Sequence, residues 1–318
     1  MSHFTLLVVG ARDEAEVERK LDPFWELDLT LEAASTDYRS DFATEFTKEG
    51  AIQEFQEFIS KAPTKEQIEY AHSNLLKNIK EEFSSTIEPF NKEEWEKWLK
   101  NNNLDSVYVK QKMDKDYYRN YEEYIKRYYG YKYNDSFEAF GYFYNPNAKW
   151  DWYQIGGRWS GFWTLKEGKE GIQGEKSWAF VDDDIPSNEC DIAKIKDIDF
   201  EAMSKKSQIR AEKNWNSCWE EYPLEYDEEG KDKNSIRKLI YGIDPDNSLE
   251  AKQKYIENSK ICSTFAVLKD GEWYEKGEVG WWGMVSNEKD QAEWDKEFEK
   301  LLKSFDPETY VAVVDCHI

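Results

Sequence analysis

Cysteine is scarce in this 318-residue chain, which contains only Cys190, Cys218, Cys262 and Cys316. The four residues lie far apart and form no Cys-x-x-Cys pair, so the spacing typical of a zinc site or a redox motif is missing. Disulfide frameworks belong mainly to small secreted domains rich in cysteine. The sequence therefore predicts reduced thiols, no metal site and a cytoplasmic protein.

Long apolar stretches are also missing from the sequence. No run approaches the ~20 residues that a membrane-spanning helix needs. The first residues lack the basic segment and the apolar core of a signal peptide. We therefore expect a protein that makes no contact with a membrane.

Basic residues are fewer than acidic ones. The chain has 43 Lys and Arg and 66 Asp and Glu, which gives a formal net charge of -23. This acidity disfavours direct binding to nucleic acid or to an anionic membrane surface. It is compatible with a basic protein partner, with mimicry of nucleic acid, or with solubility alone. The acids are mostly interleaved with lysine, which favours solubility.

The stretch Asn145–Trp163 stands out for its aromatic residues, a Gly-Gly pair and a single arginine. On a strand, Trp150 and Trp152 would share one face, and Asp151 and Tyr153 would share the other. One interpretation is a strand-turn-strand unit whose rings fill a core and whose arginine pairs with Asp151.

The other interpretation of this stretch is a ligand pocket. Indole faces stack on planar rings, Gly amides approach phosphate or carboxylate, and a guanidinium binds anions as a bidentate fork. This chemistry suits a nucleotide-like molecule. The candidate ligand-binding residues are Trp150, Asp151, Trp152, Tyr153, Gly156, Gly157, Arg158 and Trp159. The stretch matches neither a Walker motif nor Gly-x-Gly-x-x-Gly, so it predicts no phosphate loop.

The chain resembles a family of uncharacterised proteins found in bacteriophages and mobile elements. Members begin near MSHFT, carry NPN-x-KWDWY-x-x-GGRW in the middle and finish near VDCHI. The matching segments here are Met1–Thr5, Asn145–Trp159 and Val314–Ile318, and Gly280–Gly283 also fits. The resemblance implies a phage or mobile-element setting, in the cytoplasm of a host cell, and specifies no activity.

Two nearly continuous apolar runs, Ser2–Gly10 and Tyr310–Ile318, are typical of strands buried on both faces. Towards the C-terminus, strand, helix and strand follow one another as a crossover unit. The sequence predicts an α+β fold with a mostly antiparallel sheet, for which a ferredoxin-like arrangement is one form. In such a sheet the first and last strands pair.

Residues 48–130 carry helical periodicity and helix-capping signals, so they predict a helical insertion. Residues 1–47 and 131–318 then form the α+β sheet domain. The stretch 223–249 is polar, charged and rich in turn residues, which indicates a surface excursion of unknown role.

The chain has three histidines, and pairing of its end strands would bring His3 and His317 to one end of the sheet. Asp315 shares a strand face with His317. These residues are candidate catalytic groups for acid–base chemistry, or two inert histidines at strand ends. His3-Phe4-Thr5 resembles one half of the His-x-Thr pair of two-histidine phosphoesterases, although His317 is followed only by Ile318.

Three functions are compatible with these features. The first is a counter-defence protein that binds a nucleotide-like immune signal or a host defence protein. The second is a nucleotide phosphodiesterase or related hydrolase that uses His3 and His317. The third is an acidic scaffold or nucleic-acid mimic. None of the motifs calls for a cofactor, and the oligomeric state stays open.

Overall fold

The computed structural model describes residues 3–27, 35–83, 97, 99–101, 112–176, 185–226, 236–280 and 284–318. The chain divides into two compact units. The first combines Met1–Glu26 with Asn147–Ile318, and the second is Leu27–Pro146.

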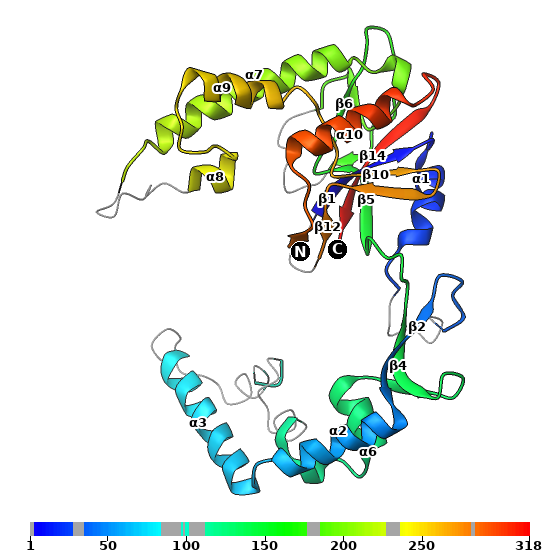
Figure 1. Ribbon diagram of the computed structural model, residues 1–318, viewed down its shortest axis with the longest axis vertical. Helices are drawn as coiled ribbons and strands as arrows, with labels where there is room; N and C mark the ends of the chain where they lie inside the picture. Colours follow the sequence, from blue (N-terminus) through cyan, green and yellow to red (C-terminus); the bar gives the residue numbers. More distant parts are fainter. Residues whose placement is uncertain are drawn as a thin grey trace. The chain divides into compact units, whose positions relative to one another are not determined.

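The first unit is built on a mixed, mostly antiparallel sheet (Figure 1). Its strands run in the order β11-β10-β1-β14-β5-β7, and β9 also pairs with β14. Their bounds are β1 His3–Val9, β5 Trp152–Gly157, β7 Glu175–Lys176, β9 Ile192–Lys194, β10 Ala266–Lys269, β11 Glu272–Glu275 and β14 Tyr310–His317. The central strands are therefore the first and the last of the chain.

Antiparallel pairing of β1 with β14 runs in register from His3 opposite His317 to Val9 opposite Val311. The predicted α+β fold and the pairing of its end strands are confirmed. Strand β1 also pairs in parallel with β10. The sheet departs from a simple ferredoxin-like order, because β5 pairs with β14 and not with β10.

Helices cover the two faces of this sheet, because alternate residues of β1 and β14 are apolar on both sides. Phe4, Leu6 and Val8 pack with α1 (Glu14–Leu21) and the 3₁₀ turn η1 (Asp22–Phe24). Leu7 and Val9 of the same strand pack against α7 and α10 instead. Those helices span Phe200–Glu221 and Gln291–Lys303.

Smaller elements complete the first unit. The helices α8 (Ile236–Tyr241) and α9 (Leu249–Asn258) lie beside α7 and share a small core with it. The remaining elements are β6 Trp163–Thr164, β8 Glu189–Cys190, the 3₁₀ turn η5 Ile195–Asp197, β12 Glu278–Val279 and β13 Val285–Ser286. Helix α8 falls within 223–249, so the described part of that stretch is not all irregular.

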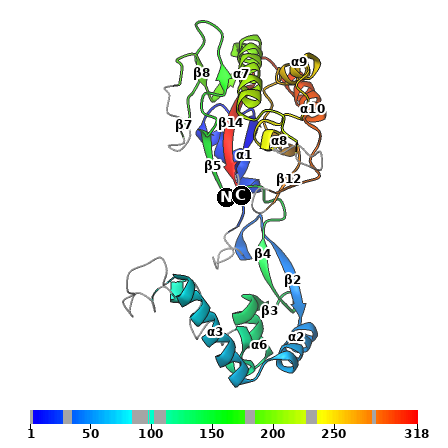
Figure 2. The same cartoon turned by 90° about the vertical axis from the view of Figure 1, so that its left-hand side faces the viewer.

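The second unit joins a three-stranded antiparallel sheet to helices (Figure 2). Its strands are β2 Asp41–Thr47, β3 Lys132–Asn134 and β4 Ala139–Tyr144. Its helical elements are α2 Lys48–Lys61, α3 Lys65–Phe83, η3 Lys115–Tyr117, α6 Tyr121–Tyr124 and the π-helix η4 Ile125–Tyr129. The expected insertion at 48–130 lies inside this unit, which also includes strands and extends to residues 27 and 146.

Parts of the segments named from the sequence lie outside the described residues. They are Met1 and Ser2 at the start of the chain, 84–96, 98 and 102–111 within 48–130, 227–235 within 223–249, and the last three positions of Gly280–Gly283. Within the described ranges, none of the helices has the length and apolar character needed to cross a membrane.

Candidate functional site

The candidate site lies where β1 begins and β14 ends, on the sheet face that α7 and α10 cover farther along. His3 stands opposite His317, and His317 stands opposite Trp152 of β5. The two imidazole rings are in contact edge to face, with centroids 5.0 Å apart. The predicted meeting of the two histidines is confirmed.

A buried carboxylate orients His3. The Nδ1 atom of His3 lies 2.7 Å from Oδ1 of Asp315, whose side chain is only 1% exposed. The other oxygen of Asp315 accepts a hydrogen bond of 3.0 Å from the backbone N–H of Arg158. Because an ionised carboxylate only accepts hydrogen bonds, Nδ1 carries the proton. The Nε2 atom of His3 is then the one left for chemistry.

A second carboxylate orients His317. Its Nδ1 lies 2.6 Å from Oδ1 of Asp151, so the same argument places the proton on Nδ1. The side chain of Asp151 is 42% exposed, in contrast to the buried Asp315. The Nε2 atom of His317 is buried and has no hydrogen-bond partner within the described part of the chain. The site therefore contains two adjacent histidine–carboxylate pairs in different environments.

Asp151, for which the sequence suggested Arg158 as a partner, is hydrogen-bonded to His317. The side chain of Arg158 is half-buried, and its main-chain amide supports Asp315. Nearby, burial raises the pKa of Glu26, and the charge of Asp151 raises it further. The charges of Glu26 and Asp151 are therefore close enough to interact.

The Gly-Gly pair brings the chain into close contact with two buried carboxylates. Gly156 and Gly157 have φ values of 76° and 55°, in the region that favours glycine. A Cβ atom at Gly156 would lie 2.5 Å from Oδ2 of Asp191, and one at Gly157 would lie 2.5 Å from Cβ of Asp315. Only glycine fits at either position, which explains this part of the sequence motif.

Asp191 holds the loop that follows the glycines. Its Oδ1 accepts hydrogen bonds from the backbone N–H groups of Gly161 (2.7 Å) and Phe162 (3.3 Å), and its Oδ2 accepts one from Gly174 (2.8 Å). Burial raises the pKa of the Asp191 carboxyl, and the three amide donors oppose that shift. Asp191 therefore fixes the loop and stays out of contact with solvent.

The aromatic residues of the motif divide between the core and the site. Trp150 is buried, donates its indole N–H to the carbonyl of Leu21, and packs edge to face on Tyr153 beside α1. The expectation that Trp150 and Trp152 share a face is wrong, because β5 begins only at Trp152.

Trp152 is the ring of this motif that reaches the site. It is 50% exposed and approaches the ring of His3 with centroids 6.1 Å apart. Trp159 is half-buried, and its backbone N–H closes the turn on Gly156. The ligand-binding residues expected from the sequence are therefore not all in one place: Trp150 and Tyr153 belong to a core.

Sequence reasoning missed Asp191, a supporting residue of the site, and noted Thr5 only as part of the His-x-Thr resemblance. Thr5 is buried, and its Oγ1 accepts a hydrogen bond from the backbone N–H of Phe265, which ties β1 to the start of β10. Asp191 stands in the mixed polar and apolar stretch Glu189–Lys194, so no pattern in the sequence marked it.

Among the residues that the structure describes, no group of three or more His, Cys, Asp or Glu side chains could hold a metal ion. Comparisons with protein-family models, with curated proteins and with solved structures found no match. Any function therefore has to be argued from the site itself.

Proposed function

We propose that the first unit binds a nucleotide-like phosphoester beside His3 and His317 and hydrolyses it by acid–base catalysis. The observation that carries the proposal is the contact between two imidazoles, each fixed at Nδ1 by its own carboxylate. A pair of histidines with opposite protonation states can move one proton in and another out of a single reaction.

The reaction assigns one step to each imidazole. A neutral histidine takes a proton from water at Nε2 while the water oxygen forms a bond to phosphorus. The protonated partner gives a proton to the leaving oxygen as the old P–O bond breaks. Each histidine ends in the other's starting state, and exchange of protons with solvent restores the pair.

Trp152 gives the proposed site its preference for nucleotides. Half of its indole is exposed next to the His3 ring, so a nucleobase can stack on it. Such stacking contributes about 1–3 kcal/mol per base. In the expected phage or mobile-element setting, the nucleotide would be an immune signal of the host. Its hydrolysis would then be a counter-defence activity.

Binding without turnover is a second candidate, and the environment of His317 favours it. Its Nε2 atom is buried in this arrangement, so the imidazole reaches a substrate only if its neighbours move. A protein that holds a nucleotide by stacking on Trp152 needs no such movement. Counter-defence would then act by sequestration of the signal.

The test incubates the protein with a panel of mononucleotides, dinucleotides and cyclic nucleotides, followed by chromatography after denaturation. Altered nucleotide supports hydrolysis, and intact nucleotide recovered from the protein supports sequestration. A panel that is neither altered nor depleted contradicts both candidates and redirects attention to a host protein as partner.

His317→Ala is the sharpest variant for the hydrolytic proposal. Loss of a general acid or base lowers rates by about 10²–10⁴-fold. Asp151 is half-exposed and can be hydrated once its partner is gone, so the melting temperature should hardly change. His3→Ala is less clean, because it leaves buried Asp315 without its imidazole. His72→Ala, in α3 of the second unit, is the matched control and should keep full activity.

A further inference from the structure

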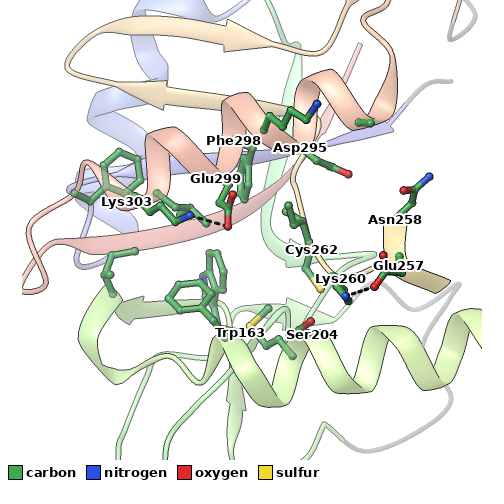
Figure 3. Close-up of a pocket in the computed structure, with 18 residues that line it drawn as sticks. Trp163, Ser204, Glu257, Asn258, Lys260, Cys262, Asp295, Phe298, Glu299 and Lys303 are labelled. Carbon is green, nitrogen blue, oxygen red and sulfur yellow. Dashed lines mark hydrogen bonds and ion pairs between the residues drawn. The ribbon is translucent and has the colours of Figure 1, made fainter. Parts of the chain in front are cut away.

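A second cavity lies in the first unit, away from the histidines, between α7, α10 and the chain after α9 (Figure 3). Its volume is about 790 Å³. Small-molecule sites occupy roughly 300–1,000 Å³. The cavity is therefore large enough for an organic ligand.

The apolar part of the lining is continuous with the hydrophobic core. Trp163, Met203, Phe298 and Phe305 line the cavity and belong to the buried cluster beneath the sheet. Phe200 lines it as well, and its side chain remains 39% exposed. Aromatic rings and a thioether make favourable contacts with another aromatic ring. This part of the lining favours the aromatic portion of a ligand.

Charged side chains line the rest of the cavity, and four of them form ion pairs. Figure 3 marks these two pairs, which are Lys260 with Glu257 at 2.5 Å and Lys303 with Glu299 at 2.9 Å. Asp295 and Lys296, which are adjacent in α10, also line the cavity. Within the described residues, neither of them forms an ion pair. One negative and one positive charge therefore remain for a ligand.

Asp295 is a buried carboxylate whose hydrogen-bond partners are all neutral. It is 5% exposed, and its Oδ1 accepts hydrogen bonds from Oγ of Ser263 (2.6 Å) and Nε2 of Gln291 (2.7 Å). Its Oδ2 has no hydrogen bond in the part of the chain that the structure describes. Figure 3 shows the side chain reaching from α10 towards Asn258. Because a buried charge is unfavourable unless it is paired, this carboxylate favours a ligand ammonium group.

Lys296 supplies the opposite charge on the same side of α10. It is exposed, and its steps of four and three residues to Ala292 and Glu299 place all three on one helix face, which lines the cavity. Consecutive Cα atoms are about 3.8 Å apart, and the lysine side chain is long and flexible. The ammonium group of Lys296 can therefore approach a carboxylate that is joined to an ammonium group at Asp295. An α-amino acid carries these two groups on one carbon atom.

We propose that this cavity binds a free aromatic amino acid. The ammonium group of the ligand pairs with Asp295, its carboxylate pairs with Lys296, and its ring packs on the aromatic part of the lining. Such a zwitterion differs in chemistry from the anionic nucleotide assigned to the histidine site, so the proposal stands independently of that function.

The first test compares three probes that share an indole ring. L-tryptophan has both charged groups, tryptamine lacks the carboxylate, and indole-3-propionate lacks the ammonium group. Titrations followed by NMR should show that the wild-type protein binds L-tryptophan most tightly. Indole-3-propionate should bind about tenfold more weakly, because it loses a charge-assisted contact with a buried group. Tryptamine should bind about threefold more weakly, because Lys296 is exposed.

Two substitutions that preserve side-chain size assign each charge to its partner. Asp295→Asn keeps an acceptor for Ser263 and Gln291, and it should weaken L-tryptophan and tryptamine about tenfold without weakening indole-3-propionate. Lys296→Met should weaken L-tryptophan and indole-3-propionate about threefold and leave tryptamine unchanged. Lys300→Met is the matched control, because Lys300 is an exposed residue of the same helix outside the described lining, and it should change none of the three affinities.

The ranking of the probes by the wild-type protein needs no variant, so the proposal remains testable if a substitution impairs folding. Failure of L-tryptophan to bind, or equal affinities of the wild-type protein for the three probes, would overturn the proposal. An equal loss of affinity for all three probes in Asp295→Asn or in Lys296→Met would overturn it as well.

Discussion

Gly157→Ala tests whether the Gly-Gly turn is needed for contact with Asp315. Gly157 has φ 55°, and the added Cβ would lie 2.5 Å from Cβ and Oδ2 of Asp315. Asp315 cannot move aside easily, because it is buried and bound by His3 and by the backbone of Arg158. The substitution therefore adds steric overlap to backbone strain.

The magnitude can be divided between these two causes. An alanine in the left-handed region costs about 1–2 kcal/mol. Overlap in a packed interior costs about 1–3 kcal/mol more. Gly168→Ala supplies the matched control, since Gly168 has φ 71° and its added Cβ would meet nothing within 4 Å. We expect Gly157→Ala to lose about 2–5 kcal/mol of unfolding free energy and Gly168→Ala about 1–2 kcal/mol.

Urea unfolding followed by tryptophan fluorescence measures both variants. All 14 tryptophans except Trp95 and Trp98 belong to the first unit, so the signal reports mainly on that unit. The difference between the two variants isolates the overlap with Asp315. Equal losses of unfolding free energy in Gly157→Ala and Gly168→Ala would refute the reasoning, because strain alone would then account for both.

Two further predictions concern buried groups. Asp191→Ala should lower the unfolding free energy by at least about 3 kcal/mol, because three backbone donors lose their acceptor. The same urea titration measures this loss, and an unchanged unfolding midpoint would contradict the role given to Asp191. Burial raises the pKa of Cys190 to about 12 and also raises that of Cys262. Thiolate is therefore depleted at about pH 8, and the folded protein should react with a disulfide reagent far more slowly than the urea-unfolded one, with half-buried Cys262 first. Equal rates would contradict this.

The sequence was most informative where one physical signal dominated. The apolar runs around Leu7 and Val313 predict strands that are covered on both faces. The antiparallel pairing of these strands places His3 opposite His317. The motif around β5 is harder to interpret, because alternation along a strand predicts the faces of its residues only from Trp152, where the strand begins. The chain before Trp152 is held instead by a bridge to Trp25, which turns Trp150 into the core.

The side-chain partners of residues in the central motif could not be derived from the sequence. Asp151 is hydrogen-bonded to His317, which lies 166 positions away. The sequence likewise did not show that Gly156 and Gly157 contact the carboxylates of Asp191 and Asp315. A Gly-Gly pair predicts only that the backbone turns or closely approaches another group. The cavity beside Trp163 depends on how α7 and α10 pack, which periodicity alone does not determine.

The register of β1 against β14 depends on the polar residues at one end of this strand pair, His3 and Asp315. From Leu6 to Val9 and from Val311 to Val314 both strands are buried on both faces, so apolar burial would change little after a slip of one residue. Such a slip would exchange the faces of β14. It would carry Asp315 to the face that α1 covers, away from His3 and the amide of Arg158.

The same groups that we assign to chemistry thus distinguish the correct strand alignment from its near neighbours. We infer that an apolar residue at position 315 would leave two alignments of similar burial. The protein would then lose the uniqueness of its fold before it lost its stability. We therefore expect Asp315 to fix the alignment of the two central strands as well as the orientation of His3.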